Sequence, residues 1–198
     1  MAIDSFIWFA APASGGLLIS GATQPKGETA DKWFAPKGAF EIEEVSFSVE
    51  NPTTVGSATG GSGAGKAKFN PFHIRKDVDA ASCPLFSACV AGAHFPSMML
   101  AVRKSGGVNL VYLQYIFRQV FVTEITWVGG GGDDNPKEEI TFVYGALGIQ
   151  YIQQKPDGSA GTALQGMWSQ ITNKTTMDVP GATGAAPTFL TGADAQQA

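Results

Sequence analysis

The strongest chemical signal in the sequence is a glycine-rich loop that ends in a lysine, Gly60-Gly61-Ser62-Gly63-Ala64-Gly65-Lys66. The backbone N–H groups of such a loop and a lysine ammonium can together hold a phosphate. The nucleotide-binding form of the motif needs Ser or Thr directly after the lysine and then a helix. Ala67 follows here, and Pro71 lies in a segment without helical periodicity. The residues therefore favour a mobile surface loop between two strands over a phosphate site.

The other reactive side chains form no recognised catalytic or metal-binding motif. His73 lies between apolar residues and His94 follows a predicted helix, and neither has a second ligand at metal spacing. Cys83 and Cys89 lack C-x-x-C spacing and are expected to be reduced, buried and structural. The acidic group within 133–139 lacks the spacing of a calcium loop. We predict no catalytic residue, no metal site and no cofactor, so the protein is not expected to be an enzyme.

The composition describes one globular domain whose surface is poor in charge. Of the 198 residues, 44% are hydrophobic and 15% are charged, which suits a single domain with a full core. A surface with few charges favours self-association. The net charge of -4 lacks the clustered positive field that phosphate backbones require, so no nucleic-acid partner is expected.

The N-terminal residues indicate a chain that is made in the cytoplasm. The segment 1–9 is apolar but contains Asp4 and no Lys or Arg, whereas a secretory signal begins with a positive region. No apolar run reaches the ~20 residues that a membrane-spanning helix needs. We expect no membrane insertion, and export would use a route without a cleaved signal peptide.

Apolar segments predict a chain that consists mostly of β-strands. Strands are expected over residues 2–9, 39–50, 66–76, 98–103, 108–128, 138–153 and 166–171, with a polar turn at 154–165. A change of apolar parity near Glu43-Glu44 predicts a β-bulge, and Pro71 predicts a second irregularity. Both parities of 108–128 are apolar, so this strand should be covered on both faces. Gly145 and Gly148 permit sharp bending, as at a barrel corner.

One helix is expected at residues 79–92, with its regular part at about 82–91. Asp79 or Ser82 can cap its start, and Gly92 can end it in the left-handed conformation. An apolar stripe should pack against the sheet, formed by Leu85, Phe86, Cys89 and Val90.

The expected fold class is mainly β, an antiparallel β-barrel or sandwich with one short α-helix. Residues 1–174 are expected to form its single domain, including an excursion at 10–37 that is rich in small residues. Residues 175–198 consist largely of Ala, Gly, Thr and Pro with little to bury. They are expected to form a low-complexity C-terminal tail that is disordered or loosely packed.

Several short motifs follow one another in a specific order over residues 1–174. They are Asp4-Ser5-Phe6-Ile7, Gly27-Glu28-Thr29-Ala30-Asp31, Gly63-Ala64-Gly65-Lys66, Ser82-Cys83-Pro84-Leu85, Gly92-Ala93-His94-Phe95-Pro96, Val102-Arg103-Lys104-Ser105-Gly106-Gly107, Tyr112-Leu113, Val120-Phe121-Val122, Glu139-Ile140-Thr141-Phe142, Tyr151, Trp168 and Asn173-Lys174. In this order they resemble the Hcp (haemolysin-coregulated protein) family of type VI secretion system tube proteins. The segment at about 10–26 is longer than is usual in that family, and the tail after Lys174 is additional.

The resemblance implies an Hcp-like barrel subunit that assembles into a homo-hexameric ring, with rings stacked into a tube. It implies a contractile sheath and a spike protein as partners, and small effector proteins carried in the lumen. A closed ring would cover apolar strand faces that a monomer leaves exposed. The glycine-rich loop resembles the extended loop by which one ring reaches the next. The candidate ring-stacking residues are therefore Gly56, Gly60, Gly61, Gly63, Gly65 and Lys66.

Two other functions stay open from the residues alone. The first is a small-molecule-binding β-barrel protein, although a barrel of this size that is rich in aromatic residues is more often filled by its own side chains. The second is a hydrolase with an unrecognised site. Closed rings in electron micrographs would distinguish a tube subunit from both.

Overall fold

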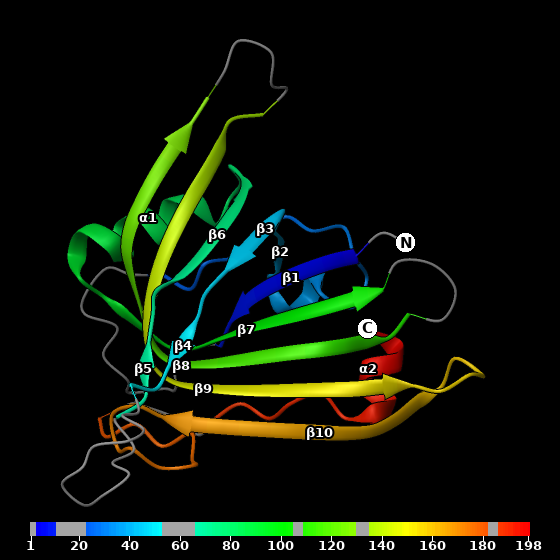
Figure 1. Cartoon of the computed structure of the whole chain (residues 1–198). Coiled ribbons are helices and arrows are strands. Elements are labelled where there is room, and N and C mark those ends of the chain that lie inside the picture. Colours follow the sequence, from blue (N-terminus) through cyan, green and yellow to red (C-terminus); the bar gives the residue numbers. More distant parts are fainter. Residues whose placement is uncertain (1–2, 11–22, 53–65, 105–108, 130–134, 182–185) are drawn as a thin grey trace, which may run out of the picture.

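The computed structural model describes residues 3–10, 23–52, 66–104, 109–129, 135–181 and 186–198, which form a strongly curled antiparallel sheet (Figure 1). The strands of this sheet are β1 (Ile3–Phe9), β2 (Phe40–Glu41), β3 (Glu44–Ser46), β6 (Phe72–Asp77), β7 (His94–Lys104), β8 (Val111–Val128), β9 (Lys137–Gln154) and β10 (Ala160–Ser169). Strands β4 (Val49–Glu50) and β5 (Lys68–Phe69) form a separate two-stranded sheet. The helices in these ranges are α1 (Ser82–Ala91), α2 (Gly192–Gln197) and a 3-10 helix, Ala35–Lys37. The predicted mainly β, antiparallel class is confirmed.

The sheet curls back on itself because residues 42 and 43 form hydrogen bonds with strands near both ends of the sheet. Its order is β2-β1-β7-β8-β9-β6-β3, and β10 pairs with the half of β9 that β6 leaves free. Ile42 N donates to Ser5 O on β1 (3.0 Å), and Glu43 N donates to Arg75 O on β6 (2.8 Å). The prediction of one strand over 39–50 with a bulge at Glu43-Glu44 is therefore wrong: the segment forms the separate strands β2, β3 and β4, and at Glu43 the chain passes from one end of the sheet to the other.

The two longest strands, β8 and β9, bend together in the middle of their shared ladder. At the bend Gln119 adopts a left-handed φ of 51°. A side chain at Gly145 would place its Cβ only 2.7 Å from Ile171 Cδ1 and 3.1 Å from Gln119 Oε1. A side chain at 145 would therefore displace the ends of these two side chains, so glycine is favoured at the corner predicted there.

The bend changes which parity of each strand faces the main core. On β8 the core-facing residue is Phe117 before the bend and Val120 after it. On β9 the corresponding residues are Leu147 and Tyr144. One half of the β8–β9 pair thus packs against the main core with one face, and the other half does so with the opposite face.

Phenylalanine fills the interior. The side chains that are at most 1% exposed in the main cluster include Phe9, Phe40, Phe72, Phe95, Phe117 and Phe142. The ring centroids of Phe72 and Phe117 are 4.6 Å apart, and those of Phe9 and Phe95 are 4.5 Å apart. Burial of one such side chain contributes roughly 2–3 kcal/mol, so this cluster is a major source of stability.

Helix α1 packs against the sheet with a narrower face than the sequence predicts. Leu85 and Ala88 are fully buried, whereas Phe86 and Val90 are 46% and 69% exposed. The prediction that Phe86 and Val90 face the sheet is therefore wrong, because the small Ala88 brings the helix close along a different line. Gly92 ends the helix in the left-handed conformation (φ 63°), as predicted.

A buried ionic network fixes the start of α1 to the sheet. Lys76 Nζ on β6 lies 2.9 Å from Glu138 Oε1 on β9 and 2.7 Å from Asp79 Oδ1, and both the lysine and Glu138 are at most 1% exposed. Ser82 Oγ donates to the same oxygen of Glu138 (2.7 Å). The Asp79 carboxylate also accepts from Ala81 N (2.9 Å), but Ala81 is the N-cap of α1 and no side chain caps the helix, so the predicted cap by Asp79 or Ser82 is wrong.

Strand β10 begins earlier than the sequence predicts. It starts at Ala160, and the turn before it is confined to the region around Asp157, whose carboxylate accepts hydrogen bonds from Ser159 N and Oγ. The polar residues at 160–165 were assigned to a turn because β10 is largely exposed and carries no apolar alternation.

A few residues of the described part of the C-terminal tail are buried, although most of it is exposed or half-buried. Met177, Val179, Ala195 and Ala198 are buried against the sheet. Small side chains bury little area each, but they allow the backbone to approach the sheet closely. The composition of 175–198 alone does not predict this packing.

We predict that Lys76→Met destabilises the protein by about 3–5 kcal/mol, because it leaves the Glu138 carboxylate buried without its cation. Urea unfolding followed by circular dichroism measures the loss. The double variant Lys76→Met/Glu138→Leu should regain most of it, since a well-packed apolar pair often replaces a buried ion pair without cost. Equal losses in the single and double variants would contradict the assignment.

Candidate assembly surface

Strand β10 presents a free edge. Within the described ranges β9 is its only strand neighbour, and Figure 1 shows β10 at the margin of the sheet. Residues 162–167 are exposed on both faces. An exposed edge offers unpaired backbone N–H and C=O groups to another strand, which monomeric proteins usually avoid.

Exposed apolar side chains lie beside this edge and form what we call the β9–β10 patch: Ile149, Tyr151 and Leu164. Leu164 is directly opposite Tyr151 in the ladder, and Ile149 is opposite Gly166, so all three share one face. Their exposed fractions are 39% for Ile149, 45% for Tyr151 and 66% for Leu164. Such a patch next to a free edge is typical of a protein–protein interface.

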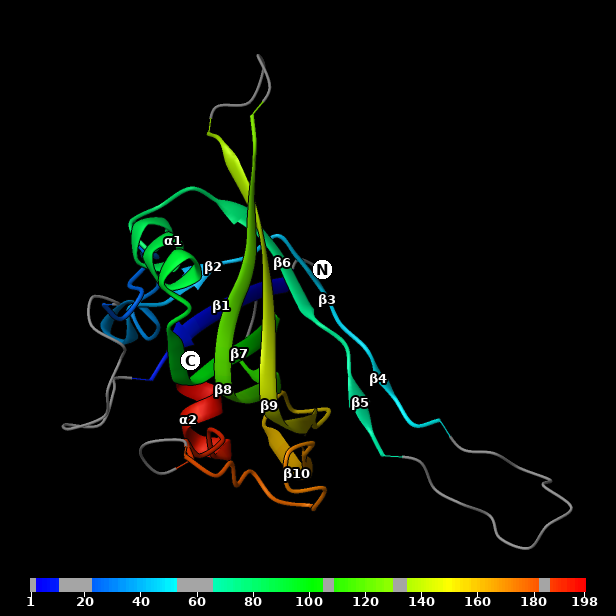
Figure 2. The ribbon, with the colours of Figure 1, turned by 90° about the vertical axis from the view of Figure 1, so that its left-hand side faces the viewer.

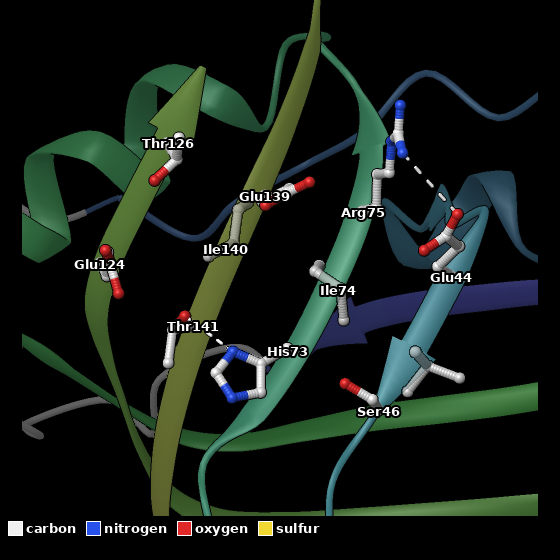
Figure 3. A pocket seen from close by; sticks show the side chains of 11 residues that line it. Glu44, Ser46, His73, Ile74, Arg75, Glu124, Thr126, Glu139, Ile140 and Thr141 are labelled. Atoms are coloured by element: carbon white, nitrogen blue, oxygen red, sulfur yellow. Dashed lines mark hydrogen bonds and ion pairs between the residues drawn. The ribbon is translucent and has the colours of Figure 1, made fainter. Parts of the chain in front are cut away.

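A second surface feature is a shallow trough of about 350 Å³ on the outer face of β3, β6, β9 and β8 (Figure 3). Its polar lining includes His73, Glu124, Glu139 and Thr141. His73 Nδ1 lies 3.0 Å from Thr141 Oγ1, so this nitrogen is engaged with a hydroxyl rather than a carboxylate.

The trough contains no recognisable catalytic arrangement. Its cation, Arg75, is already paired with Glu43 and Glu44, each at 3.7 Å. Ser46 lies opposite His73 in the β3–β6 ladder, but the bond from His73 Nδ1 goes to the other side, to Thr141 (Figure 3). Among the described residues, no group of three His, Cys, Asp or Glu side chains is placed to hold a metal ion.

The predicted stacking residues are mostly not described by the structure. Gly56, Gly60, Gly61, Gly63 and Gly65 lie in 53–65, outside the described ranges. Lys66 is described and exposed. It lies two residues before β5 in the chain, and the β4–β5 ribbon projects away from the main sheet (Figure 2).

The β4–β5 ribbon is fixed to the domain at its base. Val49 pairs with Phe69, and the Asn70 side chain donates to both Ser48 Oγ (2.8 Å) and Glu50 Oε1 (2.5 Å). The Phe69 ring stacks on Tyr144 with centroids 5.5 Å apart. The segment that carries Lys66 therefore has a defined direction where it leaves the domain.

Comparison with known proteins decides the family. The model of the family described as "Type VI secretion system effector, Hcp" matches residues 17–151. The chain belongs to the Hcp family. This family membership confirms the resemblance that the ordered motifs indicate.

Individual relatives agree with this assignment. "Protein hcp1" of Pseudomonas aeruginosa is 33% identical over 95 residues, which span 48% of this chain and 59% of that protein. A solved structure described as "Structure of a type six secretion system protein" is 30% identical, with a TM-score of 0.73 over 87% of this chain and 99% of that chain. Hcp1 from Salmonella typhimurium, at 22% identity, shares the fold with a TM-score of 0.67 over 89% of this chain and 100% of its own.

Sequence reasoning alone did not identify β10 or the β9–β10 patch as a site. The available signal is Leu164 and Met167, which lie in a segment of small and polar residues. It indicated a strand only from 166 and gave no sign that this strand is a free edge. In the described residues, no helix is long and apolar enough to cross a membrane.

We predict that Leu164→Lys weakens self-association at least tenfold, because it places a charge in the β9–β10 patch. Its effect on unfolding free energy should stay within about 0.5 kcal/mol, as for other exposed positions. Sedimentation velocity over a concentration series measures the association. Val90→Lys, an equally exposed aliphatic position on α1, is the matched control and should associate like the unaltered protein; identical behaviour of the two variants would rule out the patch.

Proposed function

We propose that this protein is a structural tube subunit of a type VI secretion system that assembles into six-membered rings. The match of the family model over residues 17–151 carries this proposal. The free edge of β10 and the adjacent β9–β10 patch support it, because a ring brings a neighbouring subunit to each edge and covers apolar surface that an isolated chain exposes.

Rings stack into a tube through the β4–β5 ribbon and the loop beyond it, with Gly56, Gly60, Gly61, Gly63, Gly65 and Lys66 as the stacking residues. The projection of the ribbon from the domain (Figure 2) and the exposed Lys66 support this assignment. The assembled tube lies inside a contractile sheath, meets a spike protein at its tip, and carries small effector proteins in its lumen.

The protein works by assembly and not by catalysis. It leaves the cytoplasm through the secretion apparatus, without a cleaved signal peptide, when the sheath contracts. The arrangement in the trough of Figure 3 supports a role without chemistry, because Arg75 is paired with two glutamates and His73 bonds a threonine.

A small-molecule-binding barrel is the weaker candidate. Such a protein needs a cavity among apolar side chains, whereas the interior of this sheet is occupied by packed phenylalanine rings. No feature of the described residues favours this function over assembly.

Electron microscopy of the purified protein, combined with light scattering, tests the assembly. We expect closed rings with a mass near six subunits, in an equilibrium that shifts toward rings as concentration rises. A monomer that persists at high concentration would contradict the proposed function.

Deletion of residues 56–64 tests the stacking role of the loop. The rings should remain intact in micrographs and light scattering, while their assembly into tubes is impaired, because the loop contacts the next ring and not the neighbour within its own ring. Loss of the rings themselves would place the loop in the lateral interface and overturn the stacking assignment.

A further inference from the structure

In the half of the β8–β9 pair that β10 adjoins, the face turned away from the main core is also covered. Its composition is unusual for a covered surface. On β8 and β9 this face carries Gln114, Ile116, Gly148, Gln150 and Ile152. Gln114 and Gln150 are register partners and only 4% and 2% exposed. Two buried primary amides need hydrogen-bond partners, and a hydrophobic core does not supply them.

The C-terminal segment 186–198 supplies these partners through its backbone. Leu190 N donates to Gln114 Oε1 (2.9 Å), and Leu190 O accepts from Gln114 Nε2 (3.5 Å) and Gln150 Nε2 (3.4 Å). The two glutamines also bond each other at 3.3 Å. A pair of side-chain amides thus binds both backbone groups of one residue, as in proteins that bind extended peptides.

Phe189, the residue before Leu190, occupies a slot that exists because residue 148 is a glycine and has no side chain. A Cβ at Gly148 would lie 3.0 Å from Phe189 Cζ and 3.2 Å from Met177 Sδ. Phe189 packs there against the cluster that contains Met99, Ile116 and Ala146. The face therefore provides an apolar slot and a backbone-binding amide pair for two successive residues.

The end of the segment makes a third set of contacts. Ala195 and Ala198 are fully buried beside Ala101 and Ile152. Arg103 Nη1 donates to Ala198 O (2.6 Å) and lies 2.7 Å from Asp31 Oδ2. Figure 1 shows the red segment with α2 lying alongside the β8–β10 part of the sheet.

The segment itself resembles a docked ligand more than a structural element of the domain. Residues 186–191 belong to no strand, and α2 is a single short helix of 6 residues closed by its own bonds, Ala195 N to Thr191 O and Ala198 N to Asp194 O. Its backbone joins no strand ladder, since the hydrogen bonds to Leu190 and Ala198 come from side chains of the sheet, and a segment held in this way can open locally.

We propose that this face of the sheet is a binding site for an extended polypeptide, and that residues 186–198 are its resident ligand, docked in a reversible equilibrium. The site accepts an aromatic residue in the Gly148 slot, followed by a residue whose backbone N–H and C=O are bound by Gln114 and Gln150. The inference does not depend on ring assembly, because every contact lies within one chain.

The test uses the full-length chain and a fluorescent peptide of residues 185–198. In Phe189→Asp the resident segment is weakened by a buried carboxylate, while the face that it covers is unaltered. The free peptide should bind this variant at least tenfold more tightly than it binds the unaltered protein, where it competes with a tethered copy at high effective concentration. Fluorescence anisotropy measures the binding.

A matched pair of variants tests the amide pair in the Phe189→Asp background. Gln114→Ala/Gln150→Ala should weaken peptide binding at least tenfold. Gln165→Ala should leave it unchanged, because Gln165 is the register partner of Gln150 on the neighbouring strand and is exposed. Circular dichroism verifies that each variant is folded.

Three results would overturn the proposal. The first is a folded Phe189→Asp chain that does not bind the peptide, and the second is a Phe189→Asp chain that does not fold, since the segment would then be an integral part of the domain. The third comes from hydrogen exchange of the unaltered protein. We expect the amides of residues 188–191 to exchange at least tenfold faster than those of β8 and β9, and exchange at the same rate would contradict a reversible docking.

Discussion

The bend that β8 and β9 share at Gln119 and Gly145 is the constraint on which the rest of the structure depends. It holds Gln119, a non-glycine residue, at φ 51°, and a Cβ at Gly145 would lie 2.7 Å from Ile171 Cδ1 and displace that side chain. Strain of this kind costs about 1–3 kcal/mol, which the buried phenylalanine cluster offsets. Beyond the bend, the half of the strand pair that contains the start of β9 meets β6 and α1. In the other half, the C-terminal segment covers the face turned away from the main core.

Charged groups join elements that are far apart in the sequence around this bent sheet. Lys76 and Glu138 connect β6, β9 and the start of α1, while Arg103 connects β7 to Asp31 and Asp4 near the N-terminus. Burial raises the pKa of Asp31, but the hydrogen bond from Arg103 and those from the Phe34 and Trp33 N–H groups outweigh it, so the pKa is lowered from 3.8. The stability that Asp31 contributes is therefore complete above its unfolded pKa and is lost as pH falls through the lower folded value. Burial raises the pKa of Tyr144 to about 12, which gives stability that is lost as pH rises from about 10 toward that value.

The sequence predicted those features that depend on local chemistry. Gly92 ends α1, and Gly145 lies at the corner. It also indicated that 108–128 is covered on both faces, and residues 186–198 provide part of the cover of the second face. The features that it missed depend on long-range packing. Ala88 rather than Phe86 faces the sheet, and Gln114 and Gln150 are buried because a distant backbone satisfies their amides. Neither fact leaves a periodic signal in the chain.

The central claim is that a neighbouring subunit covers the free edge of β10 in an assembled ring. Electron cryomicroscopy of the assembled protein, at a resolution that separates strands, tests it most directly. We predict that a backbone segment of the neighbour lies beside Ala160–Ser169 and that Leu164 and Tyr151 are buried in that contact. A ring in which β10 faces solvent along its whole free edge would contradict the account.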